Sequence, residues 1–262
     1  MLGQIENLKI GQNTISRIED ASSDMLMDID VYNLNAGDEI SISEENKESA
    51  VLILTGEVLL QWETYEKIIN RKSVFDESPY VLHVCKGNFI KVKAQKNSEV
   101  LVQRTVNERD FLAKLYTPDE CISEIFGEGV WGDTARRVVR TVFDYNNAPY
   151  SNMVMGEVIT YPGKWSSYPP HHHPQPEVYF YKFDKPQGFG FSLIGEDAYT
   201  IKDNSFSHIK GGLVHPQTSA PGYAMYYCWM IRHFDGNPWT SRVNDEKHTW
   251  LLEDNVKIWP EK

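Results

Sequence analysis

The chain lacks two features that define common protein classes: paired cysteines and long apolar runs. Its 262 residues include three cysteines, Cys85, Cys121 and Cys228, and no Cys-x-x-Cys motif. An odd number of widely spaced cysteines argues against a disulfide framework and a thiolate zinc site, so we interpret them as buried thiols. No apolar run approaches the roughly 20 residues that a membrane-spanning helix needs.

Positive charge is also in the minority. Lys and Arg number 26 against 37 Asp and Glu, which gives a formal net charge of −11. Such a balance repels phosphate backbones and anionic lipids, and therefore argues against nucleic acid or a membrane as a partner. The first residues do not combine a basic segment with an apolar stretch, so we expect no secretory signal and a cytoplasmic protein.

Helical periodicity is scarce, whereas short runs of β-branched and aromatic residues alternate with Gly, Pro, Asn and Asp turns. This pattern predicts an all-β protein with the strand spacing of sandwiches and barrels. The strands expected in the first half are Glu39–Ser43, Ala50–Leu54, Glu57–Trp62, Tyr80–Val84, Phe89–Ala94 and Glu99–Thr105. Those expected in the second half are Arg137–Phe143, Val154–Tyr161, Glu177–Phe183, Gly188–Leu193, Ser207–Ile209 and Tyr223–Ile231.

The segment between the halves has a different pattern. Glu108–Leu115 is compatible with a helix, and Thr117-Pro118-Asp119-Glu120 has the N-cap, first-turn proline and capping-box glutamate of a helix start. We therefore expect a connector over residues 107–145, between an N-terminal domain of residues 1–106 and a C-terminal domain of residues 146–262.

The two halves look like degenerate copies of one β unit. The motif Gly56-Glu57-Val58 has a counterpart in Gly156-Glu157-Val158, and aligning Gly87 with Gly212 places Ile90 where the second half has His215. This predicts a duplication in which the first half lacks a ligand residue. Chance recurrence of Gly-turn-strand motifs is the alternative.

Histidines cluster in the second half, where five of the eight lie between Pro170 and Pro216. In an extended segment His171 and His173 point to the same face, and Glu177 shares their parity. If the later strand returns beside this one, His215 completes three imidazoles and one carboxylate with open positions for water or substrate. Nitrogen ligands favour Zn, Fe, Co or Ni, and the oxygen ligand admits Mn.

This arrangement resembles the paired metal-binding motifs of cupins, and more narrowly the 5-deoxy-glucuronate isomerases of inositol catabolism. The matching motifs are Trp165-Ser166-Ser167-Tyr168-Pro169-Pro170-His171, Glu177-Val178-Tyr179-Phe180-Tyr181, Pro186-Gln187-Gly188-Phe189-Gly190-Phe191, His215-Pro216 and Pro221-Gly222-Tyr223. The resemblance implies a double cupin, in which two jelly-roll-like β-barrels follow one another with a short connecting segment and the N-terminal barrel has no metal ligands. It also implies that His171, His173, Glu177 and His215 bind a divalent metal, Zn²⁺ or Mn²⁺, with Fe²⁺ as a further option.

The activity implied by the resemblance is the aldose–ketose isomerisation of 5-deoxy-glucuronate to 5-dehydro-2-deoxy-gluconate. Such a reaction needs a Lewis acid and a base beside the reacting carbon. Tyr179 and Tyr181 share the parity of Glu177 and are candidate proton relays, with interior packing as the alternative. The anionic substrate needs a local cation, and we favour Arg232 because it ends the strand that follows His215. The other cations considered are Lys164, Lys210, Arg242, Arg136, Arg137 and Arg140.

Three other functions stay open: the related uronate ketol-isomerase of pectin breakdown, a non-catalytic cupin that binds a sugar acid, and an iron-dependent cupin dioxygenase. The expected partner is a small sugar acid in each case but the last. A homo-oligomer is a further expectation, because the apolar run Val178–Tyr181 permits burial on both faces of its strand.

Overall fold

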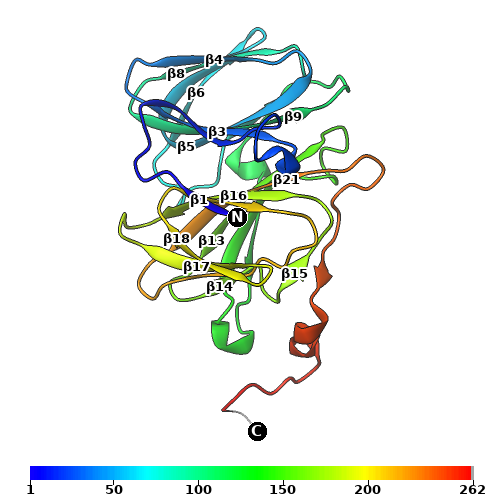
Figure 1. Cartoon of the computed structure of the whole chain (residues 1–262). Coiled ribbons are helices and arrows are strands. Elements are labelled where there is room, and N and C mark those ends of the chain that lie inside the picture. The colour runs from blue at the N-terminus through cyan, green and yellow to red at the C-terminus, as the bar shows by residue number, and fades with distance from the viewer. Residues whose placement is uncertain (261–262) are drawn as a thin grey trace.

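The computed structural model describes residues 1–260 and consists mostly of β-strands arranged in two stacked halves (Figure 1). The all-β prediction is confirmed, and the expected strands are present with ends within a few residues of those predicted, except that Ala50–Leu54 and Glu57–Trp62 belong to one strand. None of the helices in residues 1–260 is long and apolar enough to cross a membrane. The three cysteines are free and buried, as expected.

The first half is built around one long strand that bends. It contains β2 (Gly11–Ser16), β3 (Asp28–Leu34), β4 (Glu39–Ser43), β5 (Lys47–Trp62), β6 (Tyr65–Arg71), β7 (Val81–Val84), β8 (Phe89–Ala94), β9 (Ser98–Val106) and β10 (Lys114–Tyr116). The first part of β5 pairs with β7 and β9, and the second part pairs with β6 and β8. We expected two strands here, but they are one. Gly56 allows the bend, since its φ is +103° and a Cβ would lie 2.5 Å from the Asn97 carbonyl oxygen.

The second half contains two curled sheets. The larger sheet has the order β1 (Leu2–Gln4), β19 (Ser205–Ile209), β16 (Glu177–Phe183), β21 (Met225–Arg232), β13 (Met153–Thr160), β12 (Arg137–Phe143) and β11 (Ile122–Phe126). The smaller sheet has the order β14 (Trp165–Ser166), β20 (Gln217–Ser219), β17 (Phe189–Ile194) and β18 (Asp197–Lys202). A separate pair joins β15 (His171–His172) to β22 (Val243–Asn244).

The central strands of the larger sheet, β13, β16 and β21, are buried on both faces. Along β21, Tyr226, Cys228 and Met230 pack in a core shared with residues of the first half, whereas Tyr227 and Trp229 pack inside the second half. This double burial explains why the strand has no polar alternation in its sequence. The first half of the same chain therefore covers the second face of this sheet.

The expected helix over Glu108–Leu115 is wrong. Residues 107–113 have no regular secondary structure, and β10 begins at Lys114 and pairs with β7. Strand pairing with the first half overrides the helical propensity of this segment. The capping box at Thr117 is present, but it starts only the short 3-10 helix η2 (Pro118–Glu120).

The predicted domain boundaries at residues 106 and 146 stay a prediction. Strand β1, at the start of the chain, pairs with β19 of the second half. Residues 1–260 also contain the 3-10 helices η1 (Ser23–Met25), η3 (Trp131–Asp133) and η4 (Glu246–Leu252).

Candidate metal site and pocket

The four predicted ligand residues line one pocket in the second half. His171 lies on β15, Glu177 is the first residue of β16, and His173 lies in the short connection between these strands. Prolines at 169, 170, 174 and 176 keep this connection extended, because proline and the residue before it disfavour helix. His215 comes from a distant segment, two residues before β20.

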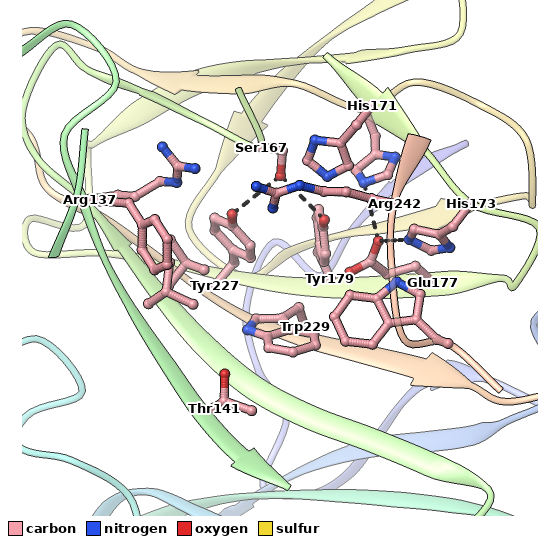
Figure 2. Close-up of a pocket in the computed structure, with 15 residues that line it drawn as sticks. Arg137, Thr141, Ser167, His171, His173, Glu177, Tyr179, Tyr227, Trp229 and Arg242 are labelled. Carbon is pink, nitrogen blue, oxygen red and sulfur yellow. Dashed lines mark hydrogen bonds and ion pairs between the residues drawn. The ribbon is translucent and has the colours of Figure 1, made fainter. Parts of the chain in front are cut away.

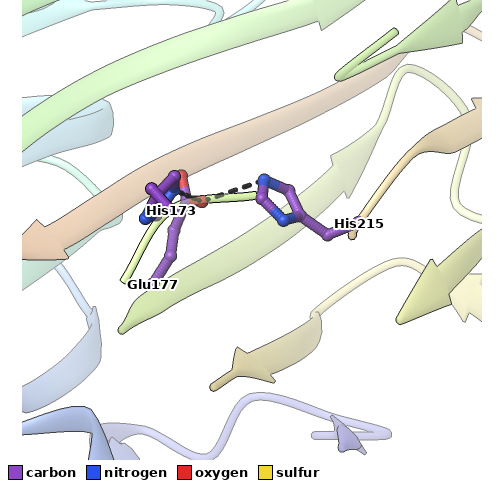
Figure 3. Close-up of side chains that lie close together, drawn as sticks. All are labelled: His173, Glu177 and His215. Atoms are coloured by element: carbon purple, nitrogen blue, oxygen red, sulfur yellow. Dashed lines mark hydrogen bonds and ion pairs between the residues drawn. The ribbon is translucent and has the colours of Figure 1, made fainter. Parts of the chain in front are cut away.

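Three of these residues converge at short distances. The ligand atoms of His173, Glu177 and His215 all lie within 4.8 Å of one another, and the three side chains are buried (Figure 3). Oε2 of Glu177 lies 3.2 Å from Nε2 of His173 and 3.3 Å from Nε2 of His215. His171 lies beside this cluster, with its ring centroid 5.0 Å from that of His215.

The backbone sets which nitrogen of each imidazole faces the pocket. In His171, His173 and His215, Nδ1 lies 2.9–3.0 Å from a backbone carbonyl oxygen two residues away in the chain. A carbonyl only accepts, so Nδ1 donates its proton to it, and Nε2 is the nitrogen that offers a lone pair to the pocket when the imidazole is neutral. Nε2 of His215 is buried and has no hydrogen-bond partner. This geometry fits a divalent ion, because metal-binding histidines commonly donate their other ring N–H in this way.

Burial keeps two of these imidazoles neutral. Desolvation and, to a smaller extent, the neighbouring His215 together lower the pKa of His171 to about 2. Desolvation also lowers the pKa of His215, against the opposing effect of Glu177. Neutral imidazole is the form that binds a metal, so this part of the protein suits a divalent ion.

Two tyrosines form the wall next to the cluster. The ring of Tyr179 lies 6.0 Å from that of His215 and 4.6 Å from that of Tyr227. The Ser167 hydroxyl lies 3.5 Å from both phenolic oxygens. Burial raises the pKa of both tyrosines, so each is a neutral phenol that can donate a proton.

Two of the other residues singled out in the sequence lie outside this pocket. Tyr181 shares the parity of Tyr179 but lies farther along the barrel, where its hydroxyl donates to Gln217 at 2.7 Å. Arg232 points to the opposite face of β21, and its Nε donates to Thr105 of the first half at 3.2 Å. Residues that face the pocket from β21 are Tyr227 and Trp229, so the even-numbered Arg232 faces away from it.

The arginines that do line the pocket are Arg137 and Arg242 (Figure 2). Arg137 is the first residue of β12 and faces the same way as Val139 and Thr141, which also line the pocket. The sequence places both arginines among several cations near the motif, but no local pattern distinguishes them. An alternation of pocket-facing residues along β12 could have indicated Arg137 once the inward face was known.

A model of the KduI/IolB family matches residues 4–251. Among curated proteins, the chain is 28% identical to the 5-deoxy-glucuronate isomerase of Geobacillus kaustophilus, over 87% of this chain and 86% of that protein. It is 23% identical to the 5-deoxy-glucuronate isomerase of Bacillus subtilis strain 168, over 95% and 97% of the two chains.

Solved structures resemble the chain over nearly its whole length. The crystal structure of an IolB-like protein from Salmonella typhimurium has a TM-score of 0.87 at 20% identity, and covers 96% of this chain and 99% of its own. A mutant of oxalate decarboxylase from Bacillus subtilis has a TM-score of 0.64 at 9% identity, over 97% and 81% of the two chains. Together with the curled sheets, these likenesses confirm the predicted double-cupin fold.

Proposed function

Because the chain belongs to the KduI/IolB family, we propose that it isomerises 5-deoxy-glucuronate to 5-dehydro-2-deoxy-gluconate. Curated relatives that carry the isomerase name match across most of the chain. The observation that carries the proposal is the convergence of His173, Glu177 and His215 in a pocket next to neutral tyrosines. An aldose–ketose isomerisation shifts a proton between two adjacent oxygen-bearing carbons. It therefore needs a Lewis acid, which the His/Glu cluster could hold, and side chains that exchange protons, such as the tyrosines.

We assign His171, His173, Glu177 and His215 as the residues that would hold a divalent ion, with Zn²⁺ and Mn²⁺ as the first choices and Fe²⁺ as the third. Three neutral imidazoles and one carboxylate leave a dication with net positive charge. When bound, such an ion is a Lewis acid that stabilises negative charge on the reacting oxygens by several kcal/mol.

Tyr179 has the role of proton donor in this proposal. Its phenol stays protonated at neutral pH because burial and the neighbouring Glu177 both raise its pKa. It therefore donates a hydrogen bond to a substrate oxygen and does not serve as the base. Tyr181 supports the wall through its bonds to Gln217 and Ser207, and Arg232 has no part in the site.

We also propose a substrate class, a pathway and a cellular location. The substrate is a small sugar acid, and the reaction belongs to inositol catabolism in the cytoplasm. The homo-oligomer expected from the sequence stays a prediction.

The test uses purified protein and 5-deoxy-glucuronate in heavy water, followed by NMR. Wild-type protein should form the ketose product with deuterium at the carbon next to the new carbonyl. Chelation should abolish turnover, and Zn²⁺ or Mn²⁺ should restore it.

Variants separate the assigned ligands from their neighbours. The double variant His171→Ala, His215→Ala should lose metal, measured by elemental analysis, and lose turnover. His172→Ala is the matched control, because this residue lies between the assigned ligands but does not line the pocket. Full turnover by the double variant would contradict the ligand assignment. Faster turnover of the uronate from pectin breakdown, or oxygen uptake on substrate addition, would contradict the proposed reaction.

A further inference from the structure

Two arginines face the pocket without any acidic partner. Arg137 is 6% exposed and Arg242 is exposed, and both line the pocket. Figure 2 shows their guanidinium groups directed into the same space. None of the ion pairs among residues 1–260 includes either arginine. The pocket therefore carries local positive charge in a protein whose formal net charge is −11.

Arg137 is unusual among the buried arginines of the described chain. The other three, Arg71, Arg104 and Arg140, each contact a buried carboxylate. Burying an isolated charge is costly, so a buried guanidinium ordinarily has such a partner. The missing counter-charge of Arg137 lies in the direction of the pocket, where a ligand can supply it.

Backbone contacts hold the Arg137 side chain in place but do not neutralise it. Nη1 donates to the carbonyl oxygen of Ala135 at 2.8 Å, and Nη2 donates to that of Tyr168 at 3.3 Å. The ring of Phe126 lies 5.6 Å from the guanidinium carbon. Burial lowers the pKa of Arg137, and the charge of Arg242 lowers it further. A bound anion would offset both the cost of burying the Arg137 charge and its repulsion by the charge of Arg242.

Arg137 lies at one end of the pocket and the ligand histidines lie at the other, with the guanidinium of Arg242 between them. Ring contacts lead from His215 to Tyr179 and from Tyr179 to Tyr227, and Tyr227 lies close enough to Arg137 to interact with it electrostatically. In Figure 2 these tyrosines lie between Arg137 and the ligand histidines. A uronate has the same polarity, because its aldehyde and its carboxylate are at opposite ends of the carbon chain.

We infer that Arg137 and Arg242 bind the carboxylate of the substrate and make this pocket selective for sugar acids over neutral sugars. The inference rests on the proposed isomerase for the identity of the substrate. A guanidinium donates two parallel hydrogen bonds to a carboxylate, which orients the substrate as well as holding it. The aldehyde end then reaches the histidine cluster.

The kinetic test compares 5-deoxy-glucuronate with its methyl ester, in which the negative charge is removed. Wild-type protein should prefer the acid. Arg137→Gln and Arg242→Gln should each raise KM for the acid roughly 10- to 100-fold, and lose most of the preference over the ester. Arg137→Lys should recover part of the affinity, because it keeps the charge but not the paired donors.

Arg136→Gln is the matched control. Arg136 is the neighbour of Arg137 but pairs with Glu128 and does not line the pocket. The KM of the Arg136→Gln variant for the acid should stay at the wild-type value. Arg242→Gln also separates loss of binding from loss of folding. Arg242 has no hydrogen bond or ion pair with residues 1–260 to lose, whereas Arg137 donates hydrogen bonds to two carbonyl oxygens.

A binding test separates this inference from the proposed reaction. Calorimetry on metal-loaded protein should show D-gluconate binding at least roughly 10-fold more tightly than neutral D-glucitol, and both Gln variants should lose this difference. If wild-type protein shows this binding but no isomerisation, the proposed function fails and the inference stands. If it isomerises the acid while both variants keep wild-type KM and gluconate affinity, the inference is overturned and the function stands. Absence of gluconate binding to wild-type protein would also overturn the inference.

Discussion

Glu157 on β13 holds the two halves of the protein together through charge, and its substitution gives a direct test of the fold. Its carboxylate is fully buried and accepts from Arg71 of β6 at 2.7 and 2.8 Å. Arg140 of β12 donates to it at 3.2 Å, and the Tyr226 hydroxyl donates at 2.9 Å. One carboxylate therefore balances two buried guanidinium groups, one from each half.

The substitution Glu157→Gln removes this charge at nearly constant volume. Both guanidinium groups stay buried and lose their counter-charge, and the new amide N–H₂ must face at least one of them. Removing one partner of a buried ion pair costs about 3–5 kcal/mol. We therefore expect the free energy of unfolding to fall by about 3–5 kcal/mol.

The control is Glu128→Gln. Glu128 pairs with Arg136 at 2.6 Å, but its side chain is 58% exposed. An exposed pair of this kind contributes no more than about 1 kcal/mol. The comparison therefore isolates the effect of burial on the same chemical change.

Urea unfolding, followed by tryptophan fluorescence and far-UV circular dichroism at fixed metal concentration, measures the difference. The transition midpoint of Glu157→Gln should shift far below those of the wild type and Glu128→Gln. A loss of less than about 1 kcal/mol for Glu157→Gln, with an unchanged urea dependence, would refute the argument that this carboxylate neutralises the two arginines.

Two further predictions concern the pocket and its surroundings. Burial and the neighbouring Arg232 lower the pKa of His233 from 6.5 to about 4, so its contribution to stability is complete above about pH 6.5 and is lost as the pH falls toward 4. The melting temperature of His233→Gln should change less with pH than that of the wild type across this window. Identical pH profiles of the melting temperature would contradict the lowered pKa of His233. Tyr179→Phe should lower kcat roughly 100-fold with unchanged metal content, because only the donor is removed. An unchanged kcat would exclude Tyr179 as the proton donor.

Much of the site was readable from the sequence because it is local. His171, His173 and Glu177 lie within seven residues of one another, and alternation along an extended chain brings their side chains to one side. Turn residues and β-branched runs likewise predicted the strands Glu39–Ser43 and Phe89–Ala94 with their observed ends.

The arginines that line the pocket could not be identified from the sequence. The sequence predicted Arg232, whereas the pocket contains Arg137 and Arg242. Strand β21 is buried on both faces, so its apolar residues do not reveal which parity points into the barrel. A shift of one residue exchanges the two faces of a strand, and only the packing of the first half against the sheet decides between them.

By itself, the sequence determined the all-β character, the histidine motif and the family it resembles, because each depends on residue types at short spacing. Only the tertiary structure decided that His215 returns to Glu177, that β1 joins the second half, and that Arg137 is buried without a carboxylate. These facts depend on pairing between segments far apart in the chain, which the alternation within any one strand does not encode.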